Sequence, residues 1–127
     1  MQVELVSPER ILFSGEAEMV ICRAEGGDIA FLDHHAPFLG ALDIGEVRII
    51  RQGQPDERAA VHGGFVEVRD NRVIILSDVA ELASQIDINR AREAKAKAEE
   101  QLRAAQDAEC EAALRRAHVR LEVADAA

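Results

Sequence analysis

Glycine, proline and phenylalanine are confined to one part of this chain, and this asymmetry divides it in two. All eight glycines, three prolines and four phenylalanines lie before residue 66, whereas residues 87–127 contain thirteen alanines. Glycine and proline mark turns and aromatic residues favour strands, while alanine with Glu, Lys, Arg and Leu favours helix. The sequence therefore predicts a β domain over residues 1–86 and a helical arm over residues 87–127.

Charge and apolar content limit the classes of partner. The net charge is −9, and residues 1–86 carry 15 acidic against 7 basic side chains. An acidic body disfavours nucleic acid, whose phosphates need a basic surface, and suits a protein partner with a basic patch. No stretch approaches the roughly 18 apolar residues of a membrane span, so we expect no direct membrane insertion.

The first 86 residues contain short stretches with the period-two alternation of strands, separated by turns every 8–12 residues. Such spacing indicates an antiparallel sandwich or barrel, and no long helical pattern interrupts it to make βαβ units. We expect tight turns at Gly26-Gly27, at Gly63-Gly64 and, as a two-residue hairpin turn, at Asp70-Asn71. The expected core residues include Val20, Phe31, Ile49, Val66 and Ile74.

The alanine-rich arm contains two candidate helix caps and two stripes of small residues. Asp87 and Asp107 each precede a helical pattern, where a carboxylate can accept from the free N–H groups of the first turn. No glycine or proline forces a turn between the stripes, so a two-helix hairpin and one rod of about 55 Å are both open. In a hairpin we expect Ala91, Ala98 and Ala105 to face Leu114, Ala117 and Leu121.

Several motifs, in order and over nearly the whole chain, resemble the epsilon subunit of bacterial F-type ATP synthases. Residues 27–37, Gly-Asp-Ile-Ala-Phe-Leu-Asp-His-His-Ala-Pro, are similar to its Gly-(Asp/Glu)-(Ile/Leu)-Gly-(Ile/Val)-(Leu/Met)-Pro-x-His-Ala-Pro run. Residues 42–45, 63–68 and 71–76 continue the pattern. Ala30 and Asp33 depart from the usual Gly and Pro, although Asp33 still suits a turn.

The resemblance implies an N-terminal antiparallel β-sandwich of about ten strands followed by a C-terminal two-helix antiparallel hairpin. It implies a non-catalytic subunit of the rotor central stalk, which couples rotation to proton flow. Its partners would be the gamma subunit and the c-ring, with the alpha and beta subunits reached by an extended arm that inhibits ATP hydrolysis. It would lie peripherally at the cytoplasmic face of the bacterial inner membrane. The alternative is a free-standing cytosolic adaptor whose arm recruits a helical partner.

The region from Asp28 to His35 is the candidate interface. In the family, the loop here faces the rotor ring, so the resemblance implies that Asp28, Asp33, His34 and His35 contact the c-ring or gamma. The adjacent histidines also suggest a metal site that Asp33 and His62 would complete, but nothing in the sequence brings these ligands together. We therefore expect no metal, and no catalytic constellation is visible.

Residues 86–91, Ile-Asp-Ile-Asn-Arg-Ala, match the (Ile/Leu)-Asp-x-x-Arg-Ala nucleotide motif of bacterial epsilon subunits. The resemblance implies that no cofactor is required and that ATP is a regulatory ligand, with carboxylates and apolar groups on the adenine and arginines on the phosphates. The same residues also allow a structural interpretation, with Asp87 capping a helix and Arg90 pairing with an acid across a hairpin. The implied site consists of Glu81, Ile86, Asp87, Arg90, Ala91, Arg116 and Arg120.

Overall fold

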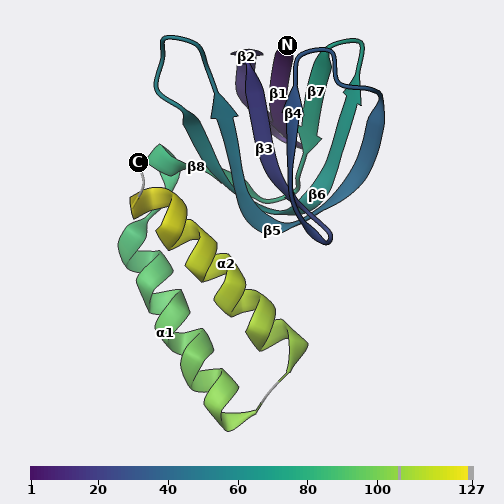
Figure 1. Ribbon diagram of the computed structural model, residues 1–127. Coiled ribbons are helices and arrows are strands. Elements are labelled where there is room, and N and C mark those ends of the chain that lie inside the picture. Colours follow the sequence, from purple (N-terminus) through teal and green to yellow (C-terminus); the bar gives the residue numbers. More distant parts are fainter. Residues whose placement is uncertain (106, 126–127) are drawn as a thin grey trace.

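The computed structural model describes residues 1–105 and 107–125, and it contains a β domain followed by two helices (Figure 1). The fold class expected from the sequence is therefore confirmed, although the described residues form eight strands where the resemblance implies about ten. The strands are β1 (Gln2–Ser7), β2 (Arg10–Glu16), β3 (Met19–Ala24), β4 (Gly27–Leu32), β5 (Phe38–Ile50), β6 (Glu57–Arg69), β7 (Arg72–Leu76) and β8 (Ala80–Leu82). A 3-10 turn, η1 (Ala83–Gln85), leads to α1 (Ile88–Ala104) and α2 (Ala108–Asp125).

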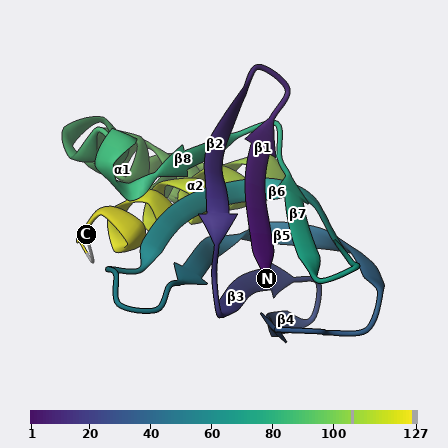
Figure 2. The ribbon, with the colours of Figure 1, turned by 90° about the horizontal axis from the view of Figure 1, so that it is seen from above.

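The eight strands of the described residues form one sheet in the order β2-β1-β7-β6-β5-β3-β4, with β8 paired to β6. The two longest strands, β5 and β6, curve strongly, so that β3 and β4 come to face β1 and β7 (Figures 1 and 2). Residues from both halves meet in one apolar core. All neighbouring strands run antiparallel except β1 and β7, which pair in parallel.

The core confirms four of the five residues expected there. Val20, Phe31, Ile49 and Val66 are all buried. Ile74 was the wrong choice, because it is only half-buried while its neighbours Val73 and Ile75 are buried. Successive side chains of a strand point to opposite faces, so the core face of β7 carries residues 73 and 75.

The turns were predicted with one error. Asp70 and Asn71 form the two-residue turn between β6 and β7, both with positive φ, and Gly26 and Gly27 lie at the β3–β4 turn. The pair Gly63-Gly64 makes no turn between strands and lies inside β6, with φ of 84° and 124°. At this point β6 stops pairing with β7 and begins to pair with β8, and the two glycines permit the bend.

The arm is a hairpin of two helices, with both expected caps in place. The carboxylate of Asp87 accepts from the N–H of Arg90 at 3.0 Å, and that of Asp107 accepts from the N–H of Cys110 at 2.8 Å. Of the small residues expected between the helices, Ala91, Ala98 and Ala117 are buried, and Leu114 and Leu121 are half-buried. Ala105 is exposed, because α1 ends at Ala104 and residue 105 is extended.

Candidate functional site

The arm meets the sandwich through a small apolar cluster near the C-terminal end of α2. Ala60 from β6, Ile86 from the segment after η1, and Val123 from α2 are buried against one another. Figure 1 shows this end of α2 beside β8 and η1, while the other ends of both helices point away from the sandwich. The junction between the domains is therefore short and lies at one end of the hairpin.

Two ion pairs also connect α2 to the sandwich. Arg120 donates from Nε to Oε1 of Glu81 on β8 at 2.5 Å, and Arg115 contacts Asp43 on β5 at 3.4 Å. The Glu81 and Arg120 side chains are about three-quarters buried, whereas the Arg115 and Asp43 side chains are more exposed. Solvent screens the second pair more strongly, so Glu81–Arg120 is the stronger electrostatic link.

His62 on β6 lies under this junction, with a side chain that is only 3% exposed. Its Nε2 is 3.7 Å from Oε1 of Glu81, and neither ring nitrogen has a hydrogen-bond partner within the described part of the chain. Burial lowers the pKa of His62 from 6.5 to about 4, and the nearby Arg120 guanidinium adds to this effect. The imidazole is therefore neutral at pH 7.

Three residues of the implied nucleotide site are engaged in structural contacts. Asp87 caps α1. Ile86 belongs to the junction cluster and is 9% exposed, and Ala91 packs between the helices at 3% exposed. In this conformation, neither apolar side chain is accessible to an adenine ring.

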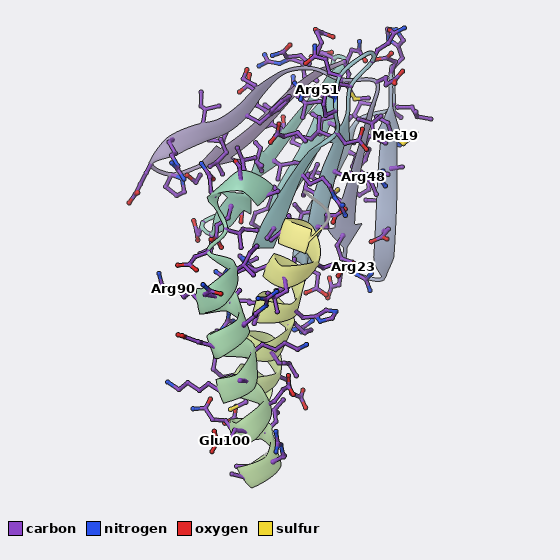
Figure 3. All side chains as sticks on the ribbon, turned by 90° about the vertical axis from the view of Figure 1, so that its left-hand side faces the viewer. Met19, Arg23, Arg48, Arg51, Arg90 and Glu100 are labelled. Atoms are coloured by element: carbon purple, nitrogen blue, oxygen red, sulfur yellow. The ribbon has the colours of Figure 1, made fainter. Side chains whose placement is uncertain are left out.

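The arginines of the implied site differ in their surroundings. Arg120 pairs with Glu81, and Arg116 donates to Glu109 at 2.7 Å, two turns earlier on α2. Arg90 is exposed at the end of α1 nearest the sandwich, far from Glu100 near the other end (Figure 3). Its side chain makes no ion pair with any residue in the ranges 1–105 and 107–124. The pairing of Arg90 across the hairpin is therefore absent there, and Arg90 alone of the three arginines is unengaged.

Asp28 does not lie with the other three residues of the implied interface. Asp33 contacts the Met1 ammonium group at 2.5 Å, and the backbone N–H of His34 donates to Oδ1 of Asn71 at 2.8 Å. The ring of His35 packs edge-on against Phe31. Asp28 lies instead near the other end of β4, where it pairs with Arg23.

Asp28 and Arg23 line a cleft of about 590 Å³ between the sandwich and the hairpin. Both acidic and basic side chains line it, and several already pair with one another. Nothing in this arrangement selects one class of ligand. Within residues 1–105 and 107–124, no three His, Cys, Asp or Glu side chains cluster in a way that could hold a metal ion.

An apolar row on the outer face of the sheet was not anticipated from the sequence. Cross-strand neighbours connect Ala41 on β5, Phe65 on β6, Leu76 on β7, Val6 on β1 and Ile11 on β2. We call these five residues the outer row. Directly opposed side chains share one face of a sheet, and Phe65, Leu76 and Ile11 are 58%, 51% and 61% exposed. Exposed apolar bands of this kind are typical of interaction surfaces.

One sequence signal does point to the outer row. Consecutive apolar residues occur at positions 11–13 and 73–76, where strict alternation would place a polar residue. Such runs indicate that both faces of the strand are apolar, which is typical of a sheet covered on both sides.

The described helices include none that is long and apolar enough to cross a membrane.

Comparison with known proteins places both parts of the chain. The beta-sandwich domain of the ATP synthase Delta/Epsilon chain matches residues 1–83, and the long alpha-helix domain of the same chain matches residues 84–125. The ATP synthase epsilon chain of Dehalococcoides mccartyi is 43% identical over 98% of this chain and 92% of its own length. That of Bacillus pumilus is 42% identical over 98% and 96%.

Solved structures agree on the fold. A chain in the mitochondrial ATP synthase of Euglena gracilis, solved with OSCP, F1 and the c-ring, has a TM-score of 0.72 at 20% identity, over 97% of this chain and 76% of its own. A chain in the central stalk and c-ring of the Tetrahymena thermophila enzyme has a TM-score of 0.55 at 19% identity, over 72% and 69%. With two matching domains and full-length relatives above 40% identity, this chain belongs to the ATP synthase epsilon chain family.

Proposed function

We propose that this chain is the non-catalytic epsilon subunit of the rotor central stalk of an F-type ATP synthase, coupling rotation to proton flow. The sandwich, residues 1–86, binds the gamma subunit and rests on the c-ring, and the hairpin, residues 87–127, regulates ATP hydrolysis. The complex holds it at the cytoplasmic face of the bacterial inner membrane. Family membership supports the assembly, and the outer row supports the way in which the sandwich attaches.

The outer row supports the proposal that the sandwich binds the gamma subunit. It offers apolar side chains from five neighbouring strands on a face turned away from the protein's own core. A rotor subunit must bind its shaft continuously while torque passes through the contact, and a broad apolar sheet face suits a permanent interface. The charged and histidine-containing end near Asp33, His34 and His35 is then left for the c-ring.

ATP fits this scheme as a regulatory ligand of the junction. Arg90 is an unengaged cation beside the cap of α1, while Arg116 and Arg120 already hold carboxylates. We infer that phosphates must displace Glu109 and Glu81 before both of these arginines can contact nucleotide, so ATP binds weakly to the docked arm. Calorimetry at millimolar ATP should detect heat with the unmodified chain and none with Arg90→Ala. Equal heats would exclude this site.

The gamma contact is tested by co-purification and by titration with isolated gamma. Phe65→Glu should weaken gamma binding about ten- to hundredfold, because the apolar burial of one large side chain is lost and a charge enters the interface. The fold should persist, since Phe65 is already 58% exposed. Val79→Glu is the matched control, because Val79 is also exposed but lies outside the outer row.

Unchanged gamma binding by Phe65→Glu would exclude the outer row as the attachment. The adaptor alternative predicts the reverse pattern, in which substitutions on the arm abolish partner binding and those on the outer row do not. The arm offers little for such a role while docked, because its buried stripe is occupied by the facing helix.

A further inference from the structure

The ring of His62 lies where the arm covers the sandwich, and its nitrogen atoms lack hydrogen-bond partners there. It projects from β6 beneath α2, with both nitrogens lacking a hydrogen-bond partner in the described residues. Leaving a buried polar group unpaired is costly, and an apolar side chain of similar shape would avoid that cost. Packing alone therefore does not account for a histidine at this position.

The charged groups that face this ring come from two elements. Glu81 on β8 is the nearest, with Oε1 at 3.7 Å from Nε2, and Arg120 and Arg116 approach from α2. On β5, the residue opposite His62 is the apolar Ile44. A proton on the ring is attracted by Glu81 and opposed by burial and by both arginines, and the opposing effects dominate.

We propose that His62 is a proton-operated latch, in which protonation of the ring releases α2 from the sandwich. Both arginines that disfavour the proton belong to α2, which also supplies cover over the ring. Lifting α2 removes them together and leaves the ring in water beside Glu81. The protonated ring then competes with Arg120 for the same carboxylate oxygen, which opposes redocking.

The direction of the pH response follows from linkage. The docked ring has its pKa lowered to about 4, whereas an uncovered ring returns to its ordinary value of 6.5. Below that ordinary value, His62 carries a proton when the arm is released and none when the arm is docked, so docking weakens as the pH falls through the window from 6.5 towards 4. Between pH 7 and pH 5, the equilibrium constant for release should rise about twentyfold.

Hydrogen exchange followed by NMR on the isolated full-length chain tests the latch. The α2 amides should show protection factors about twentyfold lower at pH 5 than at pH 7, while core sandwich amides change little. His62→Leu, which cannot take up a proton, should abolish this difference. His118→Gln is the matched control, because His118 is a histidine of α2 itself that is 64% exposed and faces Glu122. This variant should respond as the unmodified chain does.

A full pH response in His62→Leu would overturn the proposal. Direct titration of the His62 ring decides the matter if that variant does not fold. A midpoint far below 6.5, with the arm opening as the ring protonates, supports the latch, whereas a midpoint near 6.5 with α2 protection unchanged overturns it. The latch depends on the proposed function only for its consequence in the enzyme, because every measurement uses the chain without partners. A negative result in these His62 experiments would not affect the test of gamma binding with Phe65→Glu.

Discussion

The guanidinium of Arg120 and the carboxylate of Glu81, 39 residues apart in the sequence, form the ion pair that joins α2 to β8. The pair lies beside the only apolar cluster joining the arm to the sandwich that the described residues contain, formed by Ala60, Ile86 and Val123. Because the junction is small, a change in this one pair should alter the balance between docked and released arm.

Charge reversal at this pair should release the arm. Glu81→Arg places two cations together and should weaken docking by about 1 kcal/mol or more, since the pair is partly shielded from solvent. The double reversal Glu81→Arg with Arg120→Glu should restore most of the loss. Hydrogen exchange of α2 measures both effects, and a double variant no better docked than the single one would contradict the pairing.

Ala98→Leu should open the hairpin, because Ala98 is buried between the two helices. The larger side chain overpacks the seam, at a cost of about 1–3 kcal/mol. Ala96→Leu is the matched control, since Ala96 lies two residues away on the exposed face of α1. Thermal unfolding followed by circular dichroism should separate the two variants. Equal melting curves would mean that the helices are not closely packed at residue 98.

Asp87→Ala should destabilise α1 by about 0.5–2 kcal/mol, because the N–H of Arg90 loses its acceptor. Asp87→Asn keeps an acceptor at the same position and should retain most of the stability, even though the charge is gone. Exchange protection of the first turn of α1 measures the difference. If the two variants behave alike, the hydrogen bond is not what stabilises this end.

Gly64→Ala should destabilise the sandwich more than most single substitutions. Gly64 has a φ of 124°, and an added Cβ would collide with the backbone carbonyl of Leu76. Strain at such a position costs on the order of 1–3 kcal/mol before the clash is counted. Gly15→Ala, where the nearest atom would lie at 3.4 Å on the Phe13 ring, should be tolerated. Denaturant unfolding should rank them in this order, and a mild Gly64→Ala would contradict the bend in β6.

The features predicted correctly from the sequence are those that depend on nearby residues. Asp87 and Asp107 cap helices within three residues of themselves, and the Asp70-Asn71 turn is equally local. The prediction that Ile74 of β7 is buried was wrong. Residues 73–76 are all apolar, so the alternation of polar and apolar residues could not show which of them face the core. Gly63-Gly64 was taken for a turn because the sequence does not show that β6 changes partners there.

The candidate site depends on contacts between residues that lie far apart in the sequence. The outer row is assembled by register between strands up to 70 residues apart, and His62 meets Arg120 only because α2 folds back. Asp28 and Asp33 lie at opposite ends of β4, because the extended strand between them holds them apart. The sequence likewise left open whether the arm forms a two-helix hairpin or a single rod, since no glycine or proline separates the two helices.

Regulation by the arm requires a sandwich that does not depend on it. The main core cluster lies entirely within residues 1–82, so a chain ending at residue 86 should fold and still bind gamma. Ile86 would lose its cover from α2, a minor cost next to the intact core. Such a chain therefore separates the attachment of the sandwich from the action of the arm.

The rate of ATP hydrolysis by the reconstituted complex tests the central claim most directly. It should be compared for the full chain and for the chain ending at residue 86, each with and without Glu81→Arg. If a released arm inhibits, Glu81→Arg should lower hydrolysis in the full-length complex and have no effect in the truncated one. An equal rate with and without Glu81→Arg in the full-length complex, while hydrogen exchange shows the arm released, would contradict regulation by the arm.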